Sequence, residues 1–177
     1  LDQVRYLNHF YLMMLVSFLL IFLPAHRKYS MDAWIWPKIK VDQVSAWPIV
    51  LLQFQLCVVY FFGGIAKLNH DWLLLAEPMK HWLAANVDYP LLGEYFDRPW
   101  LAFGMSWGGM LLDFTAPFLI LNKRTRAYGF AAIVGFHILN DGMFEIGVFP
   151  WFMILATTVF FHPEWPKRMV RFINASN

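Results

Sequence analysis

The stretch "WPIVLLQFQLCVVYFFGGIAK", residues 47–67, decides the fold. Its first twenty residues, Trp47 to Ala66, contain no charged side chain, and the run stops at Lys67. A helix of twenty residues is about 30 Å long, which is enough to cross the hydrocarbon core of a bilayer. The stretch therefore predicts a membrane-spanning helix with a lysine at its end.

The composition extends this prediction to the whole chain. Of its 177 residues, 59% are hydrophobic and only 15% are charged, and the mean hydropathy is +0.47. A soluble domain of this length cannot bury so much apolar surface, so we expect an integral membrane protein. The net charge of +2, without a basic run among aromatic residues, argues against a nucleic-acid partner. Because the chain begins at Leu1 and shows no signal-peptide pattern, we expect it to be part of a longer protein.

Further apolar runs predict four more spanning helices. They cover residues 6–23, residues 100–121 and the stretch 127–161, which "NDGMFEIGVFP" at 140–150 splits in two. Residues 71–100 are amphipathic and broken by proline, so we expect them to lie on or dip into the membrane interface. The predicted fold class is all-α: a polytopic membrane helix bundle of about five spans, forming a single domain over residues 1–177.

The lysines and arginines predict the orientation of these spans, because cytoplasmic connections are enriched in them. Four of the fourteen fall on the side opposite to the others, namely Arg5, Lys67, Lys80 and Arg98. The remaining ones lie in the first and third connections and in the tail. We therefore expect a multi-pass protein whose N-terminal end and site face the extracytoplasmic side and whose C-terminal tail is cytoplasmic.

Polar side chains that are distant in sequence gather at the outer ends of the predicted helices. Asn8 and His9 begin the first helix, and Lys67 ends the second. His137 and Asn140 lie at the end of the fourth helix. Since these helix ends share one depth in one leaflet, they predict a candidate site.

A structural interpretation stands beside the functional one for each of these residues. Tyr60, Gly64 and Lys67 fall on one face of the second predicted helix, at 100° per residue. A plain helix–helix contact that ends in a lysine anchored at the head groups would show the same pattern. Either histidine can be a hydrogen-bonded core residue. Asp113, in the middle of the third span, is costly there unless it is partnered or protonated, so it is either a buried hydrogen-bonding hub or has a direct role.

The sequence favours a site without a metal. Its six histidines never form the HxxxH or HxxHH boxes that place imidazoles on one helical face. It also lacks GxSxG, HExxH, a P-loop and a GxGxxG placed after a strand. We expect chemistry built on lysine and histidine.

Several stretches carry a resemblance to a known family. They are "NHFYLMMLVSFLLIFLPAHRKYSMDA", "VVYFFGGIAKLNHDW", "GGMLLDFTAPFLIL", "GFHILNDGMFEIGVFPWFMI" and "FFHPEWPKRMV". In this order they resemble the vitamin K-dependent γ-carboxylase family, with its HTTM-type membrane domain, along essentially the whole chain.

The resemblance implies an enzyme that oxidises a reduced quinone with O₂ to its epoxide and couples this to carboxylation of protein glutamate with CO₂. The family's catalytic lysine falls on Lys67, and the histidine of its Asn-His pair falls on His9. The residues predicted to bind the cofactor, reduced vitamin K or a related quinol, are Asn8, Tyr60, Gly64, His137 and Asn140. The expected partners are membrane lipid, a quinone, a glutamate-containing protein substrate and other membrane subunits.

Lys67 can act as a base only when it is neutral, and a free lysine has a pKa of about 10.4. We expect desolvation behind Phe61, Phe62 and the neighbouring glycines to lower the pKa of Lys67.

The animal enzymes of this family also carry further spans and a large C-terminal region that binds the protein substrate. Two alternatives to an enzyme therefore stand: a protein that binds a quinone or lipid without turnover, and a structural subunit of a larger membrane assembly.

Overall fold

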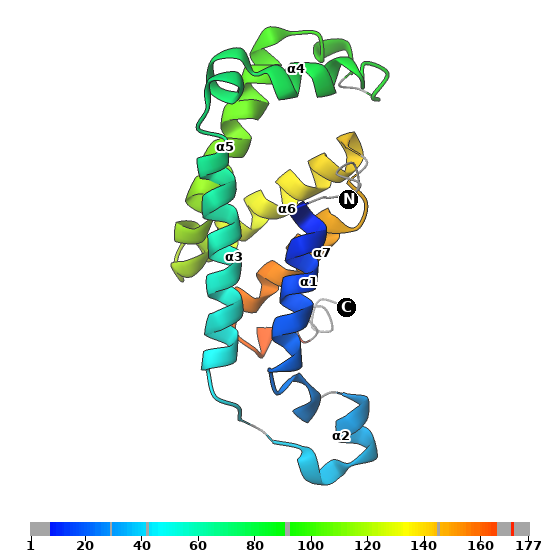
Figure 1. Ribbon diagram of the computed structural model, residues 1–177, viewed down its shortest axis with the longest axis vertical. Coiled ribbons are helices and arrows are strands. Elements are labelled where there is room, and N and C mark those ends of the chain that lie inside the picture. The colour runs from blue at the N-terminus through cyan, green and yellow to red at the C-terminus, as the bar shows by residue number, and fades with distance from the viewer. Residues whose placement is uncertain are drawn as a thin grey trace, which may run out of the picture. The chain divides into compact units, whose positions relative to one another are not determined.

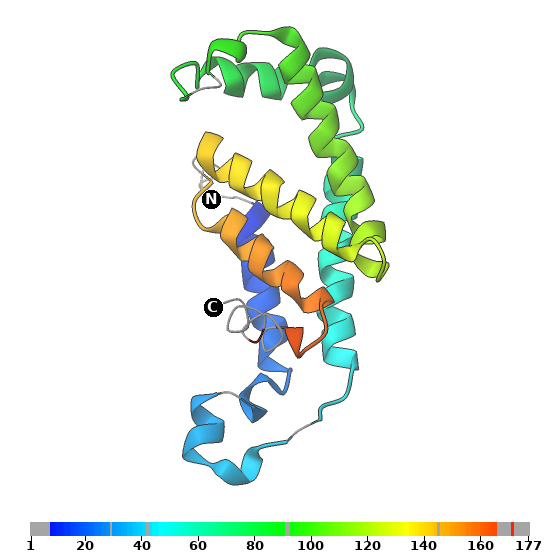
Figure 2. The ribbon, with the colours of Figure 1, turned by 180° about the vertical axis from the view of Figure 1, so that it is seen from behind.

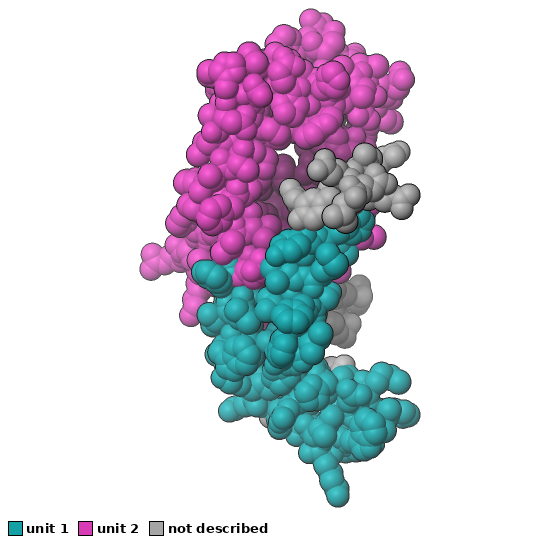
Figure 3. Space-filling model, in the orientation of Figure 1, with its two compact units in different colours: residues 1–54 teal, residues 55–177 magenta. Residues whose placement is uncertain are grey.

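The computed structural model describes residues 8–28, 30–41, 43–90, 93–144, 146–165 and 171. All regular secondary structure in these ranges is helical, which confirms the all-α prediction. The chain divides into two compact units, residues 1–54 and 55–177 (Figure 3).

The first unit begins with α1 (Asn8–Ile21), which Pro24 follows closely because proline disfavours a helical residue before it. Short elements come next: η2 (Ala25–Arg27), α2 (Met31–Ile35) and η3 (Pro37–Ile39) (Figure 1). Ser30 caps α2, since its hydroxyl accepts a hydrogen bond from the amide of Ala33 at 3.1 Å. The unit ends within α3 (Trp47–Ala66), which continues into the second unit.

The long apolar helices agree with the predicted spans. α3 has the predicted bounds, and α5 (Pro99–Leu121) begins one position before the predicted residue 100. By length and composition, these two helices can each cross a membrane, and the bent pair Phe10–Ile21 and Ala25–Ile35, which meet at 57°, can form a third span. The described residues thus support two or three spans, and the count of five stays a prediction.

The predicted break in the last apolar stretch is confirmed. α6 (Arg126–Met143) and α7 (Phe149–Thr157) lie side by side in both views (Figures 1 and 2), and α6 also packs on α5. Asn140 still lies within α6, so the break comes later than the sequence suggested. Gly147, at φ +71°, supplies the left-handed residue between the helices, and Pro150 lies in the first turn of α7, where its missing N–H costs nothing.

The turn between α5 and α6 is held by side chains that satisfy the last carbonyls of α5. Arg126 donates from Nε to the carbonyl of Ile120 at 2.8 Å, and Thr125 donates to the carbonyl of Leu119 at 2.9 Å. A Cβ added to Gly129 would lie 2.7 Å from that of Leu119. The two helices therefore meet closely at this end, which fixes the position of α6 against α5.

The segment between α3 and α5 is helical but too short to cross a membrane. It comprises the π-helical turn η4 (Asp71–Leu75), α4 (Glu77–Ala84) and η5 (Gly93–Tyr95); α4, the longest, rises only about 12 Å. Trp72 and Ser106 tie η4 to α5 reciprocally: the indole donates to the carbonyl of Ser106 at 2.7 Å, and the hydroxyl of Ser106 donates to the carbonyl of Trp72 at 2.6 Å. A buried apolar cluster joins α4, α5 and the end of α6: Ala76, Met79, Leu83, Phe96, Ala102 and Met143.

Candidate functional site

Lys67 lies directly after the last residue of α3 and forms an ion pair with Asp113 of α5. Nζ of Lys67 is 2.6 Å from Oδ2 of Asp113, and it also donates to the carbonyl of Gly63 at 3.1 Å. The two charged side chains are 22% and 11% exposed. The ring of Trp72 adds a further contact, since Nζ lies 5.4 Å from its centroid. The ammonium and the carboxylate therefore meet in a largely enclosed place on otherwise apolar helices.

A close approach between α3 and α5 brings these two residues together. A Cβ added to Gly64 would lie 2.7 Å from the backbone nitrogen of Phe114, so only glycine fits there. Phe61 stacks on Phe114 one turn earlier on α3, with the ring centroids 5.0 Å apart. Because the backbones are this close, the short side chain of Asp113 reaches Lys67.

Pro117 changes the hydrogen bonding of the Asp113 backbone. It lies inside α5, four residues after Asp113. Proline has no N–H, so the backbone carbonyl of Asp113 lacks its usual donor within the helix. Asp113 thus carries an acceptor on its backbone as well as the carboxylate that faces Lys67.

The surroundings of Lys67 differ from the purely apolar ones expected from the sequence. The side chain of Phe62 is 59% exposed, whereas Nζ faces a carboxylate, a carbonyl and an aromatic face. Each of these three contacts stabilises an ammonium group. Any base at this position is therefore the lysine together with its carboxylate partner.

A second polar cluster joins α3, α6 and α7. The hydroxyl of Tyr60 is 3.3 Å from Nε2 of His137 and 3.3 Å from Oγ1 of Thr157. All three residues are buried, with exposed fractions of 3%, 3% and 0%. Tyr60 precedes Lys67 by two helical turns, about 10 Å along α3. We call Tyr60, His137 and Thr157 the tyrosine–histidine cluster.

One nitrogen of this cluster has no hydrogen-bonding partner among the described residues. It is Nδ1 of His137, which is fully enclosed. The ring of His137 makes edge contacts with Phe136 and Phe149, with centroids 5.4 and 6.0 Å away. The cluster therefore presents a polar atom among aromatic side chains.

The other predicted site residues are placed only in part. Asn140 is half-buried in the last turn of α6, where its backbone carbonyl accepts from the amide of Phe144 at 2.8 Å. Asn8 and His9 form the start of α1, and their side chains lie outside what the structure describes. The space beside Gly64 is occupied by the backbone of α5 at Phe114, so contact between Gly64 and a ligand stays a prediction. In the described part of the chain, no three His, Cys, Asp or Glu side chains come together as a metal site requires.

Two members of these clusters were not identified as site residues from the sequence. Asp113 was recognisable as a carboxylate within an apolar span, but its pairing with Lys67 was not predicted. Thr157 gave no signal, because single hydroxyl residues are ordinary in apolar helices.

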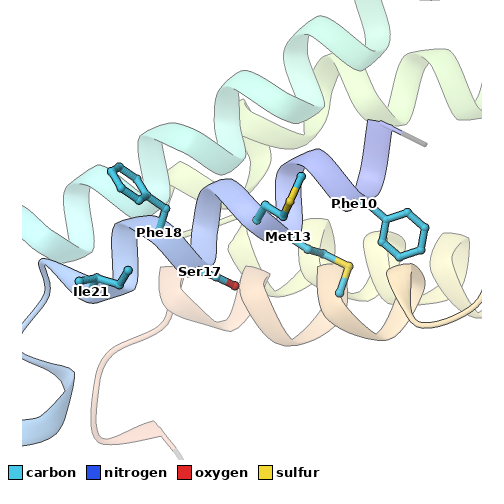
Figure 4. A pocket seen from close by; sticks show the side chains of 6 residues that line it. Phe10, Met13, Ser17, Phe18 and Ile21 are labelled. Carbon is cyan, nitrogen blue, oxygen red and sulfur yellow. The ribbon is translucent and has the colours of Figure 1, made fainter. Parts of the chain in front are cut away.

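The first unit contains a shallow groove along α1. Figure 4 shows side chains that line it; the full set is Phe10, Met13, Met14, Ser17, Phe18 and Ile21. Ser17 is the single polar residue among these six. The groove offers apolar contact and no charged group, so it suits an acyl chain or an apolar helix better than a chemical step.

Comparison with models of known protein families identifies the domain that this chain carries. The model of the HTTM domain matches residues 1–165, which include the ion pair and the tyrosine–histidine cluster. No solved structure matches the chain.

Proposed function

Since the chain belongs to the HTTM-domain family, found in vitamin K-dependent γ-carboxylase type proteins and related membrane proteins, we propose that it is a membrane enzyme acting on a quinol. The reaction is oxidation of reduced vitamin K or a related quinol by O₂ to its epoxide, coupled to carboxylation of protein glutamate. The observation that supports it most is the ion pair between Lys67 and Asp113, 2.6 Å apart on apolar helices.

The quinol supplies the reducing power: with O₂ it yields an epoxide and water, and this step provides the strong base that carboxylation of a glutamate γ-carbon by CO₂ requires. The protein must first take a proton from a quinol hydroxyl. Lys67 and Asp113 do this as a pair: Nζ passes its proton to Oδ2 across the 2.6 Å contact and accepts the hydroxyl proton in exchange. The resulting ammonium then stabilises the quinol oxyanion.

We place the quinol at the tyrosine–histidine cluster, and the residues that the structure describes there support this choice. An aromatic ring with hydroxyl groups suits the rings of Phe136 and Phe149 and the unpartnered, buried nitrogen of His137. Exclusion of water by these apolar walls would protect a strong base from being quenched. Tyr60 and His137 are thus the proposed quinol-binding residues, and the family resemblance adds Asn8, Gly64 and Asn140 to them.

His9 is the second proposed catalytic residue. By the family resemblance it orients or supplies a proton near the oxygen or CO₂ step. The proposal places the site on the extracytoplasmic side, with a quinone, membrane lipid and a glutamate-containing protein as partners and with further membrane subunits to complete the assembly.

Membranes that contain the protein test this function directly. They are given reduced vitamin K, O₂, labelled CO₂ and a glutamate peptide, and epoxide and incorporated label are scored separately. Lys67→Ala should abolish epoxide formation. Lys80→Ala serves as the control, because Lys80 is 41% exposed, and its contacts are a loose pair with Glu77 at 3.9 Å and the ring of Phe103, whose centroid is 5.4 Å from Nζ.

Because Lys67→Ala leaves a carboxylate unpaired, a second variant separates folding from chemistry. Lys67→Gln combined with Asp113→Asn replaces the ion pair by an amide pair that keeps a hydrogen bond and carries no charge. It should fold as the wild type does and form no epoxide. Full epoxidation by this variant would end the proposal, whereas quinol binding without epoxide in the wild type would favour the non-catalytic alternative. Stability only with partner subunits, with tolerance of both Lys67 variants, would favour the structural one.

A further inference from the structure

The hydrogen bonds of the tyrosine–histidine cluster determine where each proton lies. Thr157 has one hydroxyl hydrogen, and Oγ1 donates it to the carbonyl of Met153 at 2.7 Å. In the 3.3 Å contact between Tyr60 and Thr157, the tyrosine hydroxyl must therefore be the donor. The oxygen of Tyr60 can then only accept from Nε2 of His137. The chain of donors runs from His137 through Tyr60 and Thr157 to Met153.

This direction fixes the tautomer of His137. With a hydrogen on Nε2, the neutral ring carries a bare lone pair on Nδ1. A second proton on Nδ1 would create a buried positive charge, and no carboxylate is hydrogen-bonded to this ring among the described residues, so the neutral form is favoured. Nδ1 is thus a hydrogen-bond acceptor.

An enclosed acceptor without a donor is costly, and most buried polar atoms in proteins are paired. His137 is 3% exposed, and Nδ1 has no partner in the described part of the chain. A bound molecule that places a donor there completes the cluster. A carbonyl oxygen cannot do this, because it would set one lone pair against another.

We propose that Nδ1 of His137 accepts a hydrogen bond from a hydroxyl of the quinol, so that the site binds the reduced form in preference to the oxidised one. This inference rests on the proposed function and adds to it a basis for selecting the redox state. A quinol has hydroxyl donors at the positions where a quinone has carbonyl acceptors. The histidine thereby favours the quinol over the quinone before any chemistry occurs.

The test measures binding rather than turnover. The purified chain in nanodiscs is titrated without oxygen by calorimetry, first with 2-methyl-1,4-naphthohydroquinone and then with its dimethyl ether, which has no hydroxyl donor. We expect the wild type to prefer the hydroquinone by about tenfold. His137→Gln places an amide N–H near the position of Nε2 and lacks the acceptor at Nδ1, so it should lose this preference and keep its affinity for the ether.

Two controls accompany this titration. His81→Gln changes an exposed histidine of α4 and should leave the preference unchanged. Nitrogen-15 spectra of histidine-labelled protein, assigned by comparison with His137→Gln, should show Nδ1 without a proton. In Tyr60→Phe the proton is free to move to Nδ1, and the preference for the hydroquinone should fall.

The outcomes separate this inference from the proposed function. If epoxide forms but His137→Gln keeps the tenfold preference, the inference is wrong and the proposed function stands; a bound water would then be the partner of Nδ1. A protonated Nδ1 in the wild type would overturn the inference in the same way. If the wild type binds neither probe and forms no epoxide, both fail together.

Discussion

Gly64 offers the sharpest test of the contact that creates the ion pair. A Cβ at this position would lie 2.7 Å from the backbone nitrogen of Phe114 and 2.8 Å from its Cα. Real Cβ atoms essentially never come within 3.0 Å of other heavy atoms. Since the obstacle is backbone, it cannot rotate aside, and Gly64→Ala must push α3 and α5 apart by several tenths of an ångström.

Overpacking of this kind costs about 1–3 kcal/mol. Alanine also has a higher helix propensity than glycine, worth up to about 1 kcal/mol, which acts in the opposite direction. Gly108→Ala is the matched control, because it makes the same change in α5, where a new Cβ meets nothing within 4 Å. The propensity gain is common to both variants, so Gly64→Ala should be less stable than Gly108→Ala by about 1–3 kcal/mol.

Reversible unfolding of the two variants in mixed micelles, followed by circular dichroism as the fraction of denaturing detergent rises, measures this difference. Equal unfolding midpoints would refute the close α3–α5 contact. The same separation lengthens the 2.6 Å contact between Lys67 and Asp113, so Gly64→Ala should also lose epoxide formation while Gly108→Ala keeps it.

Two further predictions concern the anchoring of η4 and the orientation in the membrane. Ser106→Ala removes the donor to the carbonyl of Trp72 and should lower the free energy of unfolding by about 1–3 kcal/mol in the same assay, and an unchanged midpoint would contradict the reciprocal contact. In a Cys57→Ser background, Asp88→Cys should react with an impermeant maleimide in intact cells and Lys123→Cys only after permeabilisation; both positions are exposed, and the reverse result would overturn the predicted topology.

Much of the fold was predictable because apolar runs show where a helix can persist. The bounds of α3 followed from an uncharged stretch between a polar loop and Lys67, and the break after α6 followed from glycine and proline. Short elements such as η4 were not predictable, since a π-helical turn depends on contacts such as that of Trp72 with α5. Hydropathy alone also did not determine the number of spans, because an apolar stretch need not form one long helix. α7 has only nine residues before the 3₁₀ turn η6 (Thr158–Phe160).

The candidate site was predictable residue by residue, but its pairings were not. Lys67 and Asp113 each stood out as a charge at or within an apolar span. They are 46 residues apart, and nothing in the sequence says which helices touch at which turn. Tyr60 and His137 were predicted to share a pocket, and the structure places them in hydrogen-bonding distance. Their contact with Thr157 was not predictable, because it depends on where α7 packs.

The charge pair also has a consequence for biogenesis. α3 leaves the ribosome before α5, so Lys67 reaches the bilayer without its counter-ion and can wait at the head groups, because it follows the end of its helix. Asp113 lies in the interior of α5, so its side chain cannot reach the head groups in the same way. Insertion of an unpaired carboxylate into hydrocarbon costs free energy. Insertion of α5 is therefore favoured when α3 already lies beside it, because Lys67 then supplies the counter-ion of Asp113.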